Sequence, residues 1–266
     1  MLNEKEIFEG AKKFANEMIK EFYNRTNINV KIEFVEDIHK KKLELAKSYE
    51  ERESIISEKE FDKNTNATLI FPKFITDIQL ILISKNVIVN TINPNQLVST
   101  IPHELAHVED FYRFSVFNKV GNLNDAMKCI GYRGFYFWTE YNSKRQGYDF
   151  YRKKLNWDNS SDNAVEEIKN REFIWHLNEL KGDLQKYKSK SKLFIYCVIQ
   201  FIGRFSVWND LFPNYFNVTT LPKELLIMFD SRIVNLYNFL YENKTFEDIK
   251  YKFNELDDLL SKLYPN

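Results

Sequence analysis

His103-Glu104-Leu105-Ala106-His107 is the stretch of this 266-residue chain that says most about its fold and chemistry. It forms an H-E-x-x-H pattern, and the apolar residues around it recur at helical spacing. Two histidines four residues apart on a helix project from the same face and can share one metal ion. Glu104 lies one step round the helix, placed to handle a metal-bound water rather than to bind the metal. The stretch therefore predicts a metal site on a helix.

The helix that carries this pattern is predicted to run from about Asn93 to about Asn118. Asn93 is a suitable N-cap, and Pro94 suits the first helical position. Pro102 removes a backbone hydrogen bond, so we expect a short first turn and a kink just before the histidines. The histidines lie on one stripe of the helix. A second, apolar stripe consists of Leu97, Ile101, Leu105, Val108 and Tyr112.

The pattern is rare for this composition. The chain has 4 histidines, and we count 24 glutamates among its 38 acidic residues. Chance then gives roughly 0.005 matches in a chain of this length, the false-positive risk of a short motif. A metal site is therefore a better interpretation than a solvated helix with two ordinary histidines.

Composition limits the class of protein. With 44% apolar residues the chain can bury a substantial core, as one large domain or two small ones. The 38 basic and 38 acidic residues balance, which argues against a nucleic-acid-binding surface. Aromatic residues make up 16% of the chain, which argues against disorder.

The sequence also predicts a cytoplasmic protein that makes no membrane contact. The N-terminus lacks the basic start and apolar core of a secretory signal. The longest apolar run, 193–208, contains Gln200 and Arg204 and is too short and polar to span a membrane, so we expect a buried helix. Two cysteines, Cys129 and Cys197, fit a reducing compartment and are expected to pack as apolar side chains rather than bind metal.

Hydrophobic periodicity predicts the remaining elements. Before the motif helix we expect helices at 4–24 and 36–59 and strands at 28–34, 67–71, 78–83 and 87–89. A polar stretch at 156–163 is expected to be a loop between subdomains. After it we expect helices at 164–186, 192–208, 222–241 and 245–263, the last opened by a capping box of Thr245 and Asp248.

This element order and the H-E-x-x-H pattern together resemble the N-terminal subdomain of the zincin superfamily of metallopeptidases. In that superfamily a small twisted sheet leans on the metal-binding helix. The resemblance implies an α+β fold that is helix-rich overall: a zincin-like catalytic domain at 1–153, followed by an all-helical C-terminal subdomain at 154–266.

A catalytic zinc site usually has three protein ligands and an open position for water. The other histidines, His39 and His176, lie at no spacing that a zincin requires, and Arg113 stands where a metzincin would have its third histidine. A carboxylate remains, and we choose Glu140, 33 residues after His107 in a second predicted helix. Gluzincins, the zincin branch whose third ligand is glutamate, use this arrangement of two crossing helices.

Asp110 is the alternative third ligand. Helical geometry places it on the same face as the two motif histidines, where it can bind the metal directly or accept a histidine N–H and fix that ring. His176 is expected to be a core or interface histidine. It could still stabilise an oxyanion if the C-terminal helices cover the site.

The resemblance implies a zinc-dependent metallopeptidase in which Glu104 activates a zinc-bound water and His103, His107 and Glu140 hold the metal. The substrate would be a peptide or protein, and an extended segment would align along the strand at 78–83. A second electrophile near Glu140, in addition to the zinc, would stabilise the tetrahedral intermediate. Its candidates are Tyr132, Tyr136, Tyr141, Tyr148, Arg133 and Arg145.

Two other functions fit the same residues. One is a non-catalytic zincin-like module whose helical half binds a protein partner. The other is a zinc-dependent hydrolase of non-peptide amides. Oligomeric state, cleavage preference and regulation are not predicted by this sequence.

Overall fold

A three-stranded mixed sheet organises the N-terminal half of the chain, with strand order β1-β3-β2. The computed structural model describes residues 4–46, 48–57, 59, 65–89, 96–155, 162–187 and 191–263. The strands are β1 (Val30–Val35), β2 (Ala67–Ile70) and β3 (Gln79–Ser84). β1 runs parallel to β3 and β2 runs antiparallel to it. β3 is therefore the central strand, and residues 81–83 on it are completely buried.

Helices make up most of the rest, so the fold is helix-rich α+β, as predicted. The α-helices are α1 (Glu4–Thr26), α2 (Ile38–Leu45), α3 (Tyr49–Ser57), α5 (Asn86–Val89), α6 (Gln96–Asn118), α7 (Leu123–Ala126), α8 (Tyr132–Lys154), α9 (Asp162–Glu167), α10 (Phe173–Tyr187), α11 (Ser191–Leu211), α12 (Lys223–Phe229), α13 (Ser231–Glu242), α14 (Phe246–Ile249) and α15 (Phe253–Ser261). A π-helical turn, η1 (Ile168–Glu172), joins α9 to α10, and a 3₁₀ turn, η2 (Val218–Thr220), precedes α12.

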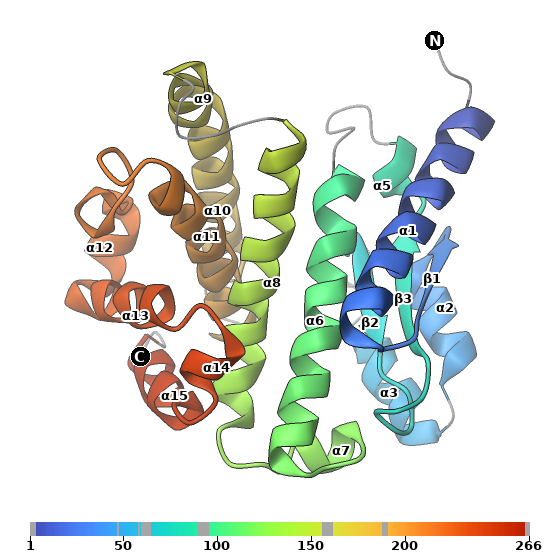
Figure 1. Ribbon diagram of the computed structural model, residues 1–266. Coiled ribbons are helices and arrows are strands. Elements are labelled where there is room, and N and C mark those ends of the chain that lie inside the picture. Colours follow the sequence, from blue (N-terminus) through green and yellow to red (C-terminus); the bar gives the residue numbers. More distant parts are fainter. Residues whose placement is uncertain are drawn as a thin grey trace.

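The long helices α6 and α8 lie side by side through the middle of the molecule (Figure 1). The sheet and α1 to α3 lie on the α6 side, and α9 to α15 lie on the α8 side. One face of the sheet packs on α1 and on the predicted apolar stripe of α6, from Leu97 to Val108. The other face packs on α2 through Ile38 and Leu82. This packing fixes α6, and with it the H-E-x-x-H stretch, against the sheet.

The larger core lies between α8 and the C-terminal helices. The predicted apolar run at 193–208 is confirmed as the buried helix α11, which packs against α8. Trp138 on α8 contacts Phe253 of α15 edge-on. The domain boundary predicted after residue 153 falls at the end of α8. Buried side chains of α8 belong to the same core as those of the C-terminal helices. Within the described ranges, no helix has the length and apolarity that a membrane span needs.

Some predicted elements differ from the structure. The predicted strand at 87–89 is wrong: these residues form α5, a single helical turn that buries Val87 and Ile88. Short β-branched runs suit a strand and a buried helical turn equally well. The helix predicted at 36–59 is two helices, because Ala46 adopts an extended backbone (φ −60°, ψ 128°) and ends α2.

The C-terminal helices are also more divided than predicted. Asp230 has φ +50° and separates α12 from α13, so the single helix expected at 222–241 is wrong. The expected helix at 245–263 is likewise two short helices. The capping box of Thr245 and Asp248 is confirmed at the start of α14. The polar stretch predicted as a loop, 156–163, falls mostly outside the described residues.

The motif helix is confirmed as α6, which continues through Pro102. Pro102 is thus an interior residue of the helix, which is continuous from Gln96 onwards. The predicted cap, Asn93 and Pro94, lies outside the described residues. The His103 turn meets α8 at Gly147, where a Cβ would lie 2.5 Å from the Ser99 carbonyl oxygen and 3.0 Å from His103 Cβ. Only glycine permits so close an approach of the two helices at this level.

Candidate metal centre

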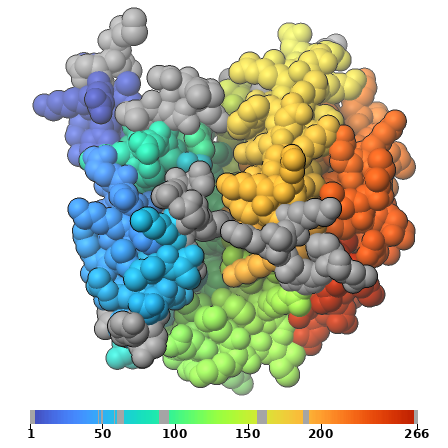
Figure 2. Space-filling model, turned by 180° about the vertical axis from the view of Figure 1, so that it is seen from behind, coloured from blue at the N-terminus to red at the C-terminus, as the bar shows by residue number. Residues whose placement is uncertain are grey.

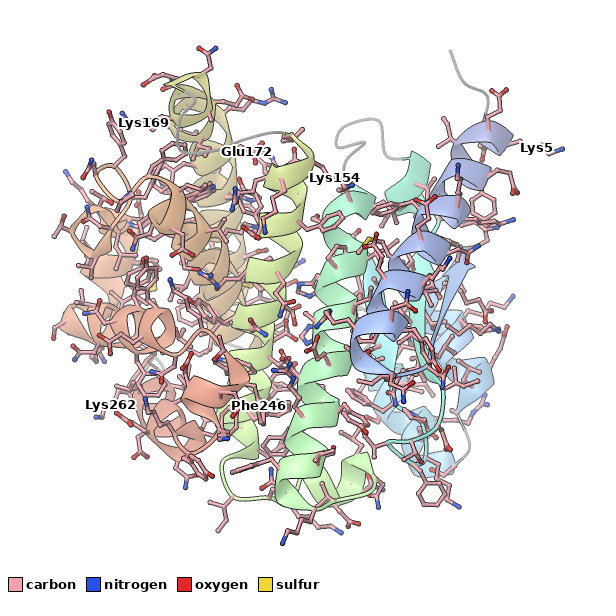
Figure 3. All side chains as sticks on the ribbon, in the orientation of Figure 1. Lys5, Lys154, Lys169, Glu172, Phe246 and Lys262 are labelled. Carbon is pink, nitrogen blue, oxygen red and sulfur yellow. The ribbon has the colours of Figure 1, made fainter. Side chains whose placement is uncertain are left out.

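His103 and His107 on α6 meet Glu140 of α8 where the two helices lie side by side. One ligand atom from each residue lies within 4.8 Å of the others, and the three side chains can hold a metal ion. Figure 3 shows the side chains that fill this helix interface. Residues predicted from motif spacing and from an expected second helix are therefore brought together by the fold.

The spacing of these atoms suits a tetrahedral ion. Ligand atoms bound to tetrahedral zinc are about 3.4 Å apart, given metal–ligand distances of about 2.0–2.2 Å. His103 Nε2 and His107 Nε2 are 3.2 Å apart, and His107 Nε2 is 3.7 Å from Glu140 Oε2. Two imidazole nitrogens and a carboxylate oxygen form a donor set that zinc accepts, as do other divalent transition metals.

A hydrogen-bonded chain orients His107. Thr139 Oγ1 lies 3.0 Å from His107 Nδ1 and donates its single proton to Asp110 Oδ2 at 2.8 Å. The threonine oxygen can then accept from Nδ1–H, which leaves Nε2 with a lone pair for a metal. Asn142 also donates to both oxygens of Asp110, at 3.1 and 2.9 Å. Asp110 thus lies behind His107 and supports that ring through Thr139.

Replacing Asp110 with asparagine is expected to weaken metal binding by about 10- to 100-fold, the usual effect of losing a group that orients a ligand. The amide has no negative charge, and its NH₂ group would face donors that now point at a carboxylate. The measurement is competition for the metal against a chelator of known affinity. Asp149→Asn, which changes a surface ion pair on α8, is the control. Equal metal affinity of the Asp110 variant and wild type would contradict this role.

The two histidines are held neutral, which is the metal-binding form. Burial, followed by the positive charge of Lys144, lowers the pKa of His107 to about 3. Burial also lowers the pKa of His103 well below its ordinary value, with smaller contributions from Lys144 and His107. The backbone of Ser143 acts to raise the pKa of His103. His103 Nδ1 nevertheless makes no hydrogen bond of ordinary geometry with the described residues.

Glu104 lies beside this cluster without belonging to it. Its Oε1 is 4.0 Å from His103 Nε2, and its side chain is buried. Burial raises the pKa of Glu104 to about 8, and the charge of Glu140 adds to the shift. The pKa of Glu140 itself is raised to about 7 by burial, while Lys144, Gln200 and Tyr196 act to lower it. A carboxyl group with a raised pKa, next to a metal-binding cluster, is suited to proton transfer.

Helix α11 adds side chains that the sequence analysis did not assign to the site. Gln200 donates to Glu140 Oε2 at 3.4 Å, and Tyr196 also hydrogen-bonds Glu140. A signal for them is present: Tyr196, Gln200 and Arg204 recur every four residues in an otherwise apolar run and so lie on one stripe of the helix. The sequence prediction used Gln200 and Arg204 only as evidence against a membrane span and gave Tyr196 no role.

A cavity of about 920 Å³ opens over the cluster. β2 and α6 form one wall, and α8, α10 and α11 form the other. Figure 2 shows the hollow between the blue N-terminal half and the yellow and orange C-terminal helices. The C-terminal half therefore lines the cleft above the metal-binding residues.

His176 is one of the residues that line this cavity. It is buried, and its Nδ1 lies 3.1 Å from Glu179 Oε2. It is thus both a core histidine and part of the cleft wall, which keeps it close to the site without making it part of the metal-binding cluster.

The proposed electrophiles fall into two groups. Tyr132, Tyr136 and Tyr148 line the cavity. The other three residues are outside its lining: Tyr141 is fully buried, Arg145 pairs with Asp210, and Arg133 pairs with Asp257. Neither cysteine belongs to the metal-binding cluster.

The prediction that an extended substrate aligns along the strand at 78–83 is wrong. Residues 79–84 form the central strand β3, whose backbone is paired on both sides. β2 is the edge strand next to the cavity and contributes Ala67, Thr68 and Leu69 to its lining. No strand in the described ranges pairs with the outer side of β2, so its backbone groups there can bind an extended ligand.

Comparisons with protein-family models, with curated proteins and with solved structures find no match for this chain. The functional interpretation therefore depends on the geometry of the site.

Proposed function

We propose that this protein is a zinc-dependent metallopeptidase of the gluzincin type. The observation that carries the proposal is the buried His103, His107 and Glu140 cluster, with Glu104 beside it, on two adjacent helices that line a cavity. Three ligands leave the fourth position of a tetrahedral metal open, as catalytic zinc sites do. The small mixed sheet packed against α6 agrees with the N-terminal architecture that the zincin resemblance implies.

Zinc held by these residues would acidify water and polarise the carbonyl of the scissile bond. Glu104 accepts the proton of the attacking water and later delivers it to the leaving amine nitrogen. Thr139 and Asp110 keep the His107 ring in place, while Gln200 and Tyr196 hold the Glu140 carboxylate. Each of these supporting groups fixes a ligand and takes no part in the proton transfer.

The substrate in this proposal is an extended peptide. Its backbone would add to the outer edge of β2, in the manner of other peptides that bind at sheet edges. The edge strand and the Glu104 carboxyl line the same cavity, so a paired peptide can pass over the metal-binding residues.

The test is hydrolysis of a peptide library by the protein before and after metal removal with a chelator, with products identified by mass spectrometry. We expect cleavage that disappears on chelation and returns when zinc is added back, because the reaction needs the acidified water. A parallel set of acylated small molecules separates a peptidase from a hydrolase of other amides. If zinc binds and neither set is cleaved, the site belongs to a non-catalytic module.

A further inference from the structure

Lys144 is the feature that the proposed mechanism does not use. It lies on α8 one turn after Glu140 and lines the cavity. Among the described residues, none makes a hydrogen bond or an ion pair with its ammonium group. A half-buried cation that keeps no partner of its own is costly, and it is a common feature of a site that receives an anion.

The position of this side chain is fixed by α11. A Cβ at Gly203 would lie 3.0 Å from Lys144 Cβ and 3.3 Å from its Cγ. The aliphatic part of Lys144 therefore packs directly on the α11 backbone, and its charged end reaches the cavity. Burial lowers the pKa of Lys144 to about 8, and the charge of Arg204 adds to this effect.

Arg204 gives the same wall a second cation. It follows Gln200 by one turn on α11, lines the cavity and donates from Nη1 to Glu179 Oε2 at 3.3 Å. The same Glu179 oxygen lies 3.1 Å from His176 Nδ1. Glu179 thus pairs with Arg204 and His176 and makes no ion pair with Lys144.

The charges that act on Lys144 come from Arg204, Glu179, Glu140 and Glu104. Glu104 and Glu140 face the metal-binding histidines, and Glu179 pairs with Arg204, so none of these carboxylates is an ion-pair partner of Lys144. Within the part of the chain that the structure describes, Lys144 is therefore a cation on this wall without an ion-pair partner. A ligand that brings one negative charge to this wall would complete the balance.

We infer that Lys144, assisted by Arg204, binds a carboxylate group of the substrate next to the metal centre. The inference rests on the proposed function and adds a substrate class: peptides with a free carboxylate within reach of the scissile bond. That carboxylate is either the C-terminus of the peptide, which would make the enzyme trim C-terminal residues, or an aspartate or glutamate side chain.

The test measures peptide binding by calorimetry to the zinc-loaded Glu104→Gln protein, in which turnover is blocked. Three versions of one short peptide are compared: a free C-terminus, an amidated C-terminus, and an amidated peptide carrying one aspartate. We expect a carboxylate to improve affinity by about 10- to 100-fold, as a charge-assisted hydrogen bond does. Preference for the first version identifies a C-terminal subsite, and preference for the third identifies a side-chain subsite.

Lys144→Met is expected to reduce that preference to about onefold, and Lys144→Arg to retain most of it. Lys186→Met is the matched control, because Lys186 lines the same cavity but is exposed and is expected to leave the preference unchanged. Circular dichroism checks that each variant is folded. If Lys144→Met does not fold, Lys144→Arg still tests the inference, because its loss of the preference would contradict it. Equal affinity for acid and amide peptides in the Glu104→Gln protein with Lys144 intact overturns the inference.

A second readout separates this inference from the proposed function. Succinate binding to the zinc-loaded wild type is compared with binding to Lys144→Met, without any peptide. Binding that depends on Lys144 in a protein that cleaves nothing supports the subsite and contradicts the peptidase. Cleavage of amidated and free peptides at equal rates supports the peptidase and overturns the subsite.

Discussion

Substituting glutamine for Glu104 is expected to lower the rate of peptide hydrolysis by about 100- to 10,000-fold, the range that a general base contributes. Glutamine has nearly the same shape but cannot take a proton from water. Glu104 lies outside the cluster of three metal-binding side chains, so bound zinc should stay near the wild-type amount. The measurement combines initial rates on the best library peptide with zinc content by elemental analysis.

Glu109→Gln is the control for this substitution. Glu109 is a buried glutamate of the same helix, but it pairs with Arg25 and Arg113 instead of facing the cavity. We expect this variant to keep its activity. A Glu104→Gln protein that binds zinc and cleaves at the wild-type rate would rule out Glu104 as the base and, with it, the proposed mechanism.

Local patterns predicted the part of the site that lies on one helix. The prediction of His103, Glu104 and His107 depended only on their spacing within α6 and on the apolar stripe that packs this helix on the sheet. Glu140 was also predicted, because the gluzincin resemblance supplies a second helix that crosses the first. In the structure the two helices lie side by side, and the absence of a side chain at Gly147 permits their close approach near His103.

The supporting groups depend on contacts between helices, which spacing alone does not reveal. Asp110 was expected on the ligand face, yet its role is set by Thr139 and Asn142 of α8. The α11 stripe was visible in the sequence, but nothing in the sequence showed that α11 packs against α8. The edge strand was misassigned for a related reason: strand order within a sheet follows from long-range pairing, which period-two patterns do not encode.

Removal of a metal ligand is the second test with a large expected effect. His107→Ala and Glu140→Ala are each expected to reduce bound zinc from about one ion per chain to nearly none under dilute conditions, since a catalytic site has only three protein ligands. Activity should be lost with the metal. Elemental analysis after gel filtration in metal-free buffer measures the zinc, and circular dichroism verifies the fold.

His39→Ala is the matched control, because His39 lies on α2 and outside the cavity lining and the metal-binding cluster. It should bind zinc as the wild type does. Thermal unfolding gives an independent readout, since a ligand that binds only the folded state raises the unfolding temperature. We expect zinc to raise it in the wild type and in His39→Ala, and to leave it unchanged in His107→Ala and Glu140→Ala. A wild-type protein that stays folded but takes up no zinc would show that the three side chains are a buried polar cluster without a metal, and the proposed chemistry would then have no basis.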